Sequence, residues 1–161
     1  MMKEVKAQAM TPEDFAPFGK LLIPTEDKIT FSNEKVRHYN AVGTFDTMGK
    51  DPAVSFFTVK RRDFVLDSLE RHVRSSEIFF PVRGAALMPF APTLPDGSPD
   101  IANVRVFVCG EDGPFTCERG VWHLFPFPVG ERYDSWVIVE RALIEEDLEV
   151  VTLKEPVRIV L

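Results

Sequence analysis

Three side chains that can bind a metal ion or transfer protons lie close together in the segment LERHVRSSEIFFPVRG, residues 69–84. They are Glu70, His72 and Glu77. The chain contains three histidines, and a second one, His123, ends the segment GVWH. Two imidazoles and two carboxylates form a suitable ligand set for one divalent metal ion such as Zn, Ni, Mn or Fe. Without a metal, the same four groups can act as general acids and bases.

The spacing of these residues predicts how strands would position them. Residues two apart on a strand face the same way, so Glu70 and His72 can project together into a barrel. Glu77 begins the next predicted strand, and His123 belongs to a much later strand that a closed barrel would bring alongside. The alternative is a structural role: a Trp-His pair on an aromatic strand can stack and hydrogen-bond, and both glutamates can form surface ion pairs.

The rest of the chain predicts an all-β fold, because short segments rich in β-branched and aromatic residues alternate with turn residues. One short helix is predicted at residues 11–14, where Thr can cap the first turn and Pro can begin it. A hairpin is predicted over residues 77–90, with Gly84 free to adopt positive φ in its turn. Residues 63–69 fit either an extended segment or a helical turn. Strands are predicted at residues 20–23, 36–42, 54–60, 77–82, 85–90, 104–109, 115–117, 121–125 and 135–141, with a turn at 110–113 and a possible edge strand at 150–153.

Length and composition indicate one domain over residues 1–161, with 45% hydrophobic residues and 14 Phe available for its core. The net charge of −6 argues against nucleic-acid or anionic-membrane partners, which favour basic surfaces. No apolar run approaches the ~20 residues that span a bilayer, and the N-terminal segment lacks the apolar core of a signal peptide. We therefore expect a cytoplasmic protein in which Cys109 and Cys117 stay reduced, and are unreactive because no histidine adjoins them in sequence.

The spacing Glu-x-His-x4-Glu-x6-Gly from Glu70 to Gly84 resembles the first cupin motif, His-x-His-x3-4-Glu-x6-Gly. The segment Gly120-x-x-His123 resembles the second cupin motif. Glu70 stands where the first histidine of the family usually lies, and Glu118 replaces the usual proline of the second motif. A carboxylate can still ligate a metal, so the resemblance implies either one divalent metal ion at the four side chains above or a metal-free site.

A closer resemblance covers almost the whole chain. The segments TPEDFAPFGKLLI, LERH, SEIFFPVRG, VRVF, GVWH and SWVIVER together resemble the ureidoglycolate lyase family, also called ureidoglycolate hydrolase. The resemblance implies a cupin-like double-stranded β-helix (jelly-roll) barrel that forms a homodimer. It also implies an activity, the release of glyoxylate and urea from ureidoglycolate in purine (allantoin) breakdown.

The chain departs from this family pattern at three places. Residues 114–117 are Pro-Phe-Thr-Cys where the family usually carries Gly-Val-Asn-Tyr. Leu124 follows the Trp-His pair where a second histidine is common. Ser135 stands where an acid is usual, although Asp134 is adjacent. Each departure can change the walls of a pocket, and therefore the substrate.

The implied reaction is elimination from a carbinolamide, in which a base removes the hydroxyl proton and an acid protonates the departing urea nitrogen. We expect His72 or Glu77 as the base and His123 as the acid. The substrate is a small carboxylate, and Arg105 is expected to bind it because it lies in mid-strand among apolar residues. Glu70 is expected to contribute to substrate binding. Arg105 could instead neutralise an acid at the mouth of the barrel.

Two other functions fit the same residues. The first is a different metal-binding cupin enzyme that acts on another small hydroxy or keto acid. The second is a non-catalytic barrel that binds a small molecule. Elemental analysis of the untreated protein tests the first, because a metal-free preparation that cannot be reconstituted argues against it. Ligand-dependent stabilisation without turnover would favour the binding protein.

Overall fold

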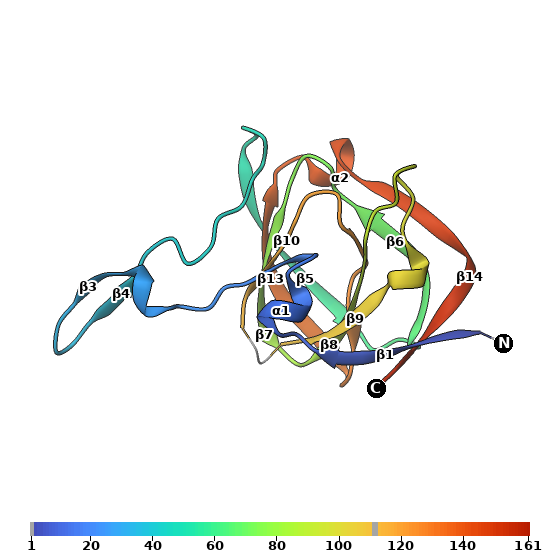
Figure 1. Ribbon diagram of the computed structural model, residues 1–161, viewed down its shortest axis with the longest axis horizontal. Helices are drawn as coiled ribbons and strands as arrows, with labels where there is room; N and C mark the ends of the chain where they lie inside the picture. The colour runs from blue at the N-terminus through green and yellow to red at the C-terminus, as the bar shows by residue number, and fades with distance from the viewer. Residues whose placement is uncertain (1, 111–112) are drawn as a thin grey trace.

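Strands make up 51% of the computed structural model and helices 9%, as the all-β prediction requires. The structure describes residues 2–110 and 113–161. The helices are α1 (Pro12–Phe15) and α2 (Leu143–Glu146), and the 3-10 turns are η1 (Glu26–Lys28) and η2 (Ile101–Asn103). The strands, shown in Figure 1, are β1 (Lys3–Ala9), β2 (Gly19–Leu21), β3 (Ile29–Ser32), β4 (Arg37–Tyr39), β5 (Pro52–Lys60), β6 (Val65–Arg71), β7 (Glu77–Arg83), β8 (Ala86–Ala91), β9 (Arg105–Cys109), β10 (Phe115–Cys117), β11 (Trp122–His123), β12 (Phe127–Pro128), β13 (Arg132–Glu140) and β14 (Glu149–Val160).

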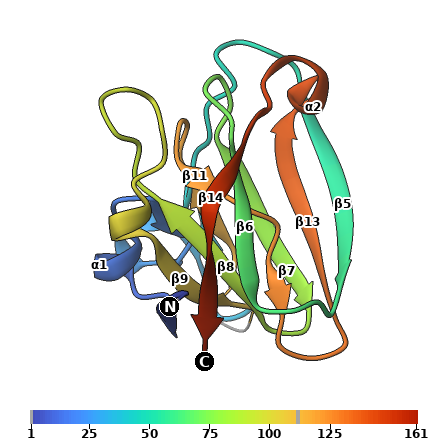
Figure 2. The ribbon, with the colours of Figure 1, turned by 90° about the vertical axis from the view of Figure 1, so that its right-hand side faces the viewer.

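Six strands close into a barrel in the order β11-β6-β14-β1-β9-β8, and β8 pairs back with β11. The barrel is mixed, because β1 runs parallel to both β14 and β9. A second sheet has the order β2-β10-β7-β13-β5, and Figure 2 shows its strands β7, β13 and β5 beside β6 and β14. This arrangement confirms the predicted cupin-like barrel.

The core divides into an aromatic cluster and a mainly aliphatic one. Helix α1 supplies Phe15, which is fully buried and makes edge contacts with the rings of Phe90, Phe107 and Phe115 at centroid distances of 5.0–5.7 Å. The helix begins as predicted, because the Thr11 hydroxyl accepts a hydrogen bond of 3.1 Å from the Asp14 backbone N–H. The second cluster lies inside the six-stranded barrel and contains Leu66, Leu69, Leu87, Val106, Val157 and Ile159.

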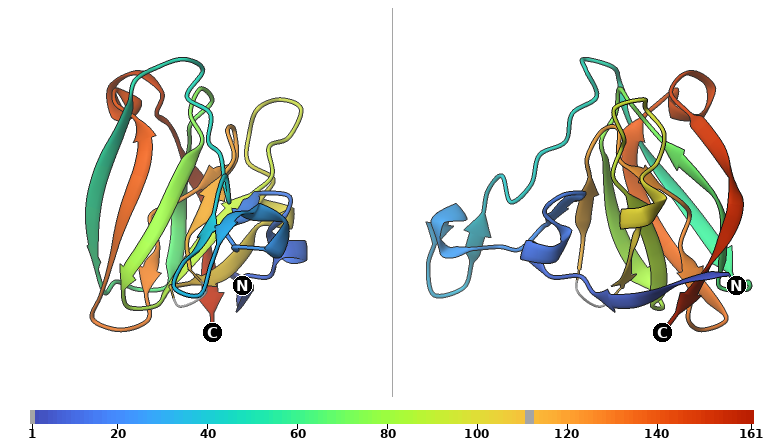
Figure 3. Two further views of the ribbon diagram at one scale, coloured as in Figure 1. Left: turned by 90° about the vertical axis from the view of Figure 1, so that its left-hand side faces the viewer. Right: turned by 45° about the vertical axis from the view of Figure 1, so that its right-hand side comes forward.

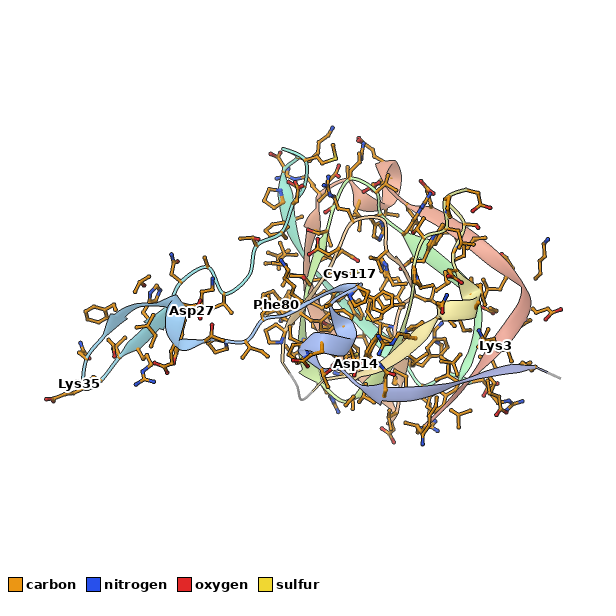
Figure 4. The ribbon with its side chains drawn as sticks, in the orientation of Figure 1. Lys3, Asp14, Asp27, Lys35, Phe80 and Cys117 are labelled. Atoms are coloured by element: carbon orange, nitrogen blue, oxygen red, sulfur yellow. The ribbon has the colours of Figure 1, made fainter. Side chains whose placement is uncertain are left out.

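Strands β3 and β4 form a separate two-stranded sheet that projects from the barrel (Figure 1). Lys35 lies at the tip of this hairpin in Figure 4. The strand predicted over residues 36–42 is therefore shorter, limited to Arg37–Tyr39, and it pairs with β3, where no strand was predicted. The two chain ends lie close together at one end of the barrel (Figure 3), where Lys3 pairs with Val157.

Three further elements differ from the sequence predictions. Strand β1 and helix α2 were not predicted, and the expected edge strand at residues 150–153 is part of the long strand β14, which lies between β6 and β1. The ambiguous residues 63–69 are mostly strand β6. The turn predicted at residues 110–113 includes residues 111 and 112, which lie outside the described part of the chain. Across the described residues, no helix is long and apolar enough to cross a membrane.

Candidate active site

The four side chains singled out in the sequence line one cavity of about 210 Å³. Glu70 lies near the end of β6, His72 just after that strand, and Glu77 at the start of β7. Closure of the barrel places His123 directly opposite Glu70, because the short strand β11 pairs with both β6 and β8. The structure therefore places His123, which comes from a much later strand, beside Glu70, His72 and Glu77.

The rest of the cavity wall is largely apolar. It comes from both sheets and from α2, and includes Phe57, Phe79, Met88, Phe125, Val137 and Leu143. Arg141 and Ile144 also line the cavity and are exposed to solvent. Pockets for drug-sized ligands usually enclose ~300–1,000 Å³. The smaller volume here fits a small substrate with a few polar groups.

His72 is held in one orientation by a backbone carbonyl. Its side chain is buried, and Nδ1 lies 2.9 Å from the carbonyl oxygen of Asp147. Because a carbonyl oxygen only accepts hydrogen bonds, Nδ1 must carry the hydrogen. In the neutral ring the lone pair is then on Nε2, which lies 4.0 Å from Glu77 Oε1. Nε2 can therefore accept a proton or bind a metal ion.

His123 has acceptors near both ring nitrogens. Nδ1 lies 3.0 Å from the Val121 carbonyl oxygen, and Nε2 lies 3.0 Å from Glu77 Oε2. Burial alone would lower the pKa of His123, but the neighbouring Cys117 and Glu77 outweigh it and raise that pKa well above the ordinary value. Burial also raises the pKa of the Cys117 thiol, which is therefore neutral near pH 7. The charge that favours protonated His123 is consequently that of the Glu77 carboxylate.

The two glutamates of the site differ in their environment. Burial would raise the pKa of Glu77, but the neighbouring histidines, His123 above all and also His72, together outweigh this effect and lower the pKa below its ordinary value. Burial raises the pKa of Glu70, and the positive charge of His123 offsets this only in part. The Oε2 atom of Glu77 is buried and, within the described residues, forms no aligned hydrogen bond despite its closeness to His123. Such an oxygen is suited to a further proton or a cation.

The donor atoms of Glu70, His72 and His123 lie within 4.8 Å of one another, close enough to share one metal ion. Glu77, Cys117 and His123 form a second group of this kind. Imidazole and carboxylate donors suit divalent transition ions. The backbone carbonyl that holds Nδ1 of His72 is the type of outer contact that orients metal-binding histidines. The donor set therefore fits the predicted metal, without distinguishing between Zn, Ni, Mn and Fe.

The structure does not bring Arg105 to this cavity. Its guanidinium pairs with Asp14, with 2.5 Å between Nη2 and Oδ1, and also donates to the Asp14 carbonyl oxygen. Helix α1, where Figure 4 labels Asp14, provides this partner. The expectation that Arg105 binds the substrate carboxylate is therefore corrected. Arg105 instead neutralises an acid, Asp14 of helix α1.

Three polar residues near the cavity were missed. Arg141 and the buried Glu140 line it, and Asp147 holds His72. The alternation along β13 contains the signal for Arg141, because Val137 and Val139 face the cavity and Arg141 continues the same series. Asp147 carries no comparable signal, since its contact with the His72 ring is made by its backbone carbonyl oxygen.

The departures at residues 114–117 and at Leu124 have different consequences. Leu124 belongs to the aliphatic core, so the histidine missing there does not alter the cavity wall. The Sγ atom of Cys117 lies 3.7 Å from Nδ1 of His123. No histidine adjoins Cys117 in sequence, but strand β10 carries it to the site, so the reason given for expecting it to be unreactive does not hold for Cys117.

Comparison with known proteins gives a consistent result. A family model described as "Ureidoglycolate lyase" matches residues 2–160. The chain is 27% identical over 182 residues to a ureidoglycolate lyase of Schizosaccharomyces pombe, a match that covers 98% of this chain and 95% of that protein. It is 32% identical over 147 residues to a ureidoglycolate lyase of Pseudomonas paraeruginosa, which covers 88% and 85% of the two chains.

Proposed function

We propose that this chain, which belongs to the ureidoglycolate lyase family, cleaves ureidoglycolate into glyoxylate and urea. The observation that carries the proposal is the pair of buried histidines in one small cavity, His72 with its Nε2 lone pair available and His123 with a raised pKa. A base and an acid at neighbouring positions are what elimination from a carbinolamide requires. This activity belongs to purine (allantoin) breakdown.

The proposed reaction moves one proton from oxygen to nitrogen. His72 Nε2 takes the proton of the substrate hydroxyl, and the carbon–oxygen double bond of glyoxylate forms. The carbon–nitrogen bond breaks, and its electron pair remains on the urea nitrogen, which takes a proton from His123. The Glu77 carboxylate lies between the two rings, with Oε1 4.0 Å from His72 Nε2 and Oε2 3.0 Å from His123 Nε2. After each turnover it can therefore transfer the proton from His72 back to His123.

Arg141 replaces Arg105 in our proposal for substrate binding. Among the described residues that line the cavity, Arg141 is the sole Lys or Arg, and it is exposed to solvent. A guanidinium there can bind the substrate carboxylate with two hydrogen bonds. Glu70, whose pKa is raised by burial, is proposed to contact the hydroxyl or ureido group of the substrate.

As an alternative to this acid–base pair, a divalent metal ion fits the same centre, with Glu70, His72 and His123 as ligands and Glu77 as a further carboxylate. When bound, it would polarise the substrate hydroxyl oxygen and make its proton easier to remove. The closeness of Cys117 to His123 is the one feature that favours the second candidate, a metal-dependent enzyme for another small hydroxy acid. It adds a soft donor beside the ligand set.

The products test the proposal directly. Purified protein, untreated or supplemented with Zn²⁺, Mn²⁺ or Ni²⁺, is incubated with ureidoglycolate, and urea and glyoxylate are quantified. The expected result is equal amounts of both, formed faster than by spontaneous decay. Ammonia in place of urea would indicate hydrolysis of the amide instead. Decay at the spontaneous rate under every condition would refute the lyase function.

The remaining expectations stay proposals. We propose that the chain acts in the cytoplasm, as a homodimer and without nucleic-acid or membrane partners. The net charge of −6 supports the absence of a nucleic-acid partner. The exposed apolar side chains of Val54, Phe56, Val82 and Trp136 on the outer face of β5, β13 and β7 support a subunit contact.

A further inference from the structure

The turn between β6 and β7 connects His72 to Glu77, and one buried carboxylate binds it. Asp147 accepts hydrogen bonds from three consecutive backbone N–H groups, those of Val73, Arg74 and Ser75, at 2.9, 2.8 and 3.0 Å. Asp147 is buried, with 5% of its surface exposed. Hydrogen bonds of N–H groups to a charged carboxylate are among the stronger ones in proteins, so these contacts restrict the turn that carries the site.

The same residue contacts the His72 ring through its backbone. The carbonyl oxygen of Asp147 accepts the hydrogen of His72 Nδ1 at 2.9 Å. The side chain and the main chain of Asp147 thus hold the turn and the ring together. A movement of Asp147 relative to the turn would break the contact that determines which ring nitrogen carries the hydrogen.

The segment that ends in Asp147 also forms part of the cavity. Helix α2 places Leu143 and Ile144 in the cavity wall. Arg74 of the turn binds Glu140, the last residue of β13, at 2.9 Å and Glu146, the last residue of α2, at 3.2 Å. These ion pairs hold the α2 segment against the β6–β7 turn, at the end of the barrel where Figure 2 shows α2.

We propose that Asp147 is a positioning residue for His72. Its carboxylate fixes the β6–β7 turn, and its carbonyl oxygen fixes the ring with hydrogen on Nδ1 and the Nε2 lone pair toward the cavity. Without this contact the ring is free to adopt the other tautomer, in which Nε2 carries the hydrogen and cannot accept a proton from the substrate. The kinetic part of this inference rests on the proposed lyase function.

The test compares Asp147→Asn with Glu145→Gln. The second variant loses a charge at an exposed acid of helix α2, the helix that Asp147 follows. An asparagine amide cannot accept all three N–H groups, because one oxygen is replaced by a donor. We expect kcat to fall about 10- to 100-fold, as for other residues that orient a catalytic or metal-binding histidine. KM should stay within about twofold, since the side chain does not line the cavity. Glu145→Gln should match the wild type in both constants.

Nitrogen-15 NMR of the histidine side chains gives a readout that does not depend on activity. Wild-type His72 should show hydrogen on Nδ1, and Asp147→Asn should show a mixture of tautomers or the Nε2–H form. An unchanged tautomer together with unchanged kcat in folded Asp147→Asn would overturn the proposal. Asp147→Ala removes the carboxylate altogether and can be compared in the same way; if it fails to fold, Asp147→Asn still tests the positioning role. If the wild type lacks lyase activity, the NMR result alone decides the positioning role.

Discussion

At the scale of single residues, His72 and His123 differ in what surrounds their ring nitrogens. One has a backbone carbonyl at Nδ1 and its Nε2 toward the cavity, and the other has an acceptor at each nitrogen. Two histidines therefore can take opposite roles within one small cavity. The difference arises from the contacts of Asp147 and Glu77, and does not depend on the imidazole rings themselves.

The spacing within LERH predicted the orientation of these side chains correctly. Glu70 and His72 line the cavity, whereas Arg71 between them packs over the Trp122 ring and pairs with Glu149. The alternation of a strand is sufficient for such a prediction. It was insufficient for Arg105, because alternation along one strand does not reveal that Asp14 of helix α1 lies nearby and pairs with it.

Arg141→Gln tests the assignment of the substrate carboxylate. We expect KM for ureidoglycolate to rise about tenfold or more, because charge-assisted hydrogen bonds contribute ~1.5–3 kcal/mol, with a smaller effect on kcat. Steady-state kinetics measures both constants. Arg105→Gln is the matched control, since its guanidinium lies outside the cavity and binds Asp14. A larger loss of affinity in Arg105→Gln than in Arg141→Gln would contradict the assignment.

At the scale of elements, the strands with strong local signals were predicted and those without were missed. The hairpin of β7 and β8 follows from two apolar runs and a glycine turn, and Gly84 has the expected positive φ of 77°. Strand β1 reads KEVKAQA, whose charged residues give no local sign of its place between β14 and β9. Its pairing depends on partners at the far end of the chain, which local propensity does not contain.

Gly84→Ala tests the hairpin turn. An added Cβ would lie 2.6 Å from the Arg132 carbonyl oxygen, in addition to the strain of positive φ. We expect the free energy of unfolding to fall by about 1–3 kcal/mol. Gly130→Ala is the control, because its Cβ would meet no heavy atom within 4 Å. Equal urea midpoints for the two variants would show that the turn does not require glycine.

Asp134 at the start of β13 predicts a dependence of stability on pH. Burial would raise its pKa, but hydrogen bonds from Thr58 and Arg132 outweigh burial and lower it. A carboxyl whose pKa is lower in the folded state stabilises the fold above its unfolded pKa, ~3.9, and this stabilisation is lost as pH falls through the folded value. Asp134→Asn should therefore melt at a lower temperature at pH 7, with a difference that shrinks toward acid pH.

Thermal unfolding at pH 7 and at pH values below ~3.9 measures this difference. Glu155→Gln, a change at an exposed acid of β14, should give no comparable pH-dependent difference. A difference between wild type and Asp134→Asn that is constant with pH would attribute the effect to packing and not to ionisation.

At the scale of the whole molecule, closure of the barrel creates the site. Strand β11 contains two residues, and its pairing with β6 and β8 places His123 beside Glu70. Local patterns indicated many short strands but not their order. The expectation that these residues meet depended on a closed barrel, which the resemblance to a barrel family supported. The positions of Arg141 and Asp147 needed the three-dimensional arrangement.

The apolar outer face of the second sheet predicts a dimer. Trp136 is 47% exposed and packs on Phe56 with ring centroids 4.7 Å apart. Light scattering after size exclusion should give about twice 18.3 kDa for the wild type and a single chain mass for Trp136→Glu. Val150→Glu changes an exposed apolar residue of β14 and should remain dimeric. A monomeric wild type would contradict the predicted homodimer.

The initial rate of urea release from ureidoglycolate by wild type, His72→Gln and His123→Gln tests the central claim most directly. Both variants must first give folded protein with wild-type circular dichroism. The account predicts a wild-type rate above spontaneous decay and a loss of kcat/KM of at least about 100-fold in each variant, the scale of general acid–base catalysis. Variants that retain the wild-type rate would show that the chemistry occurs elsewhere in the molecule.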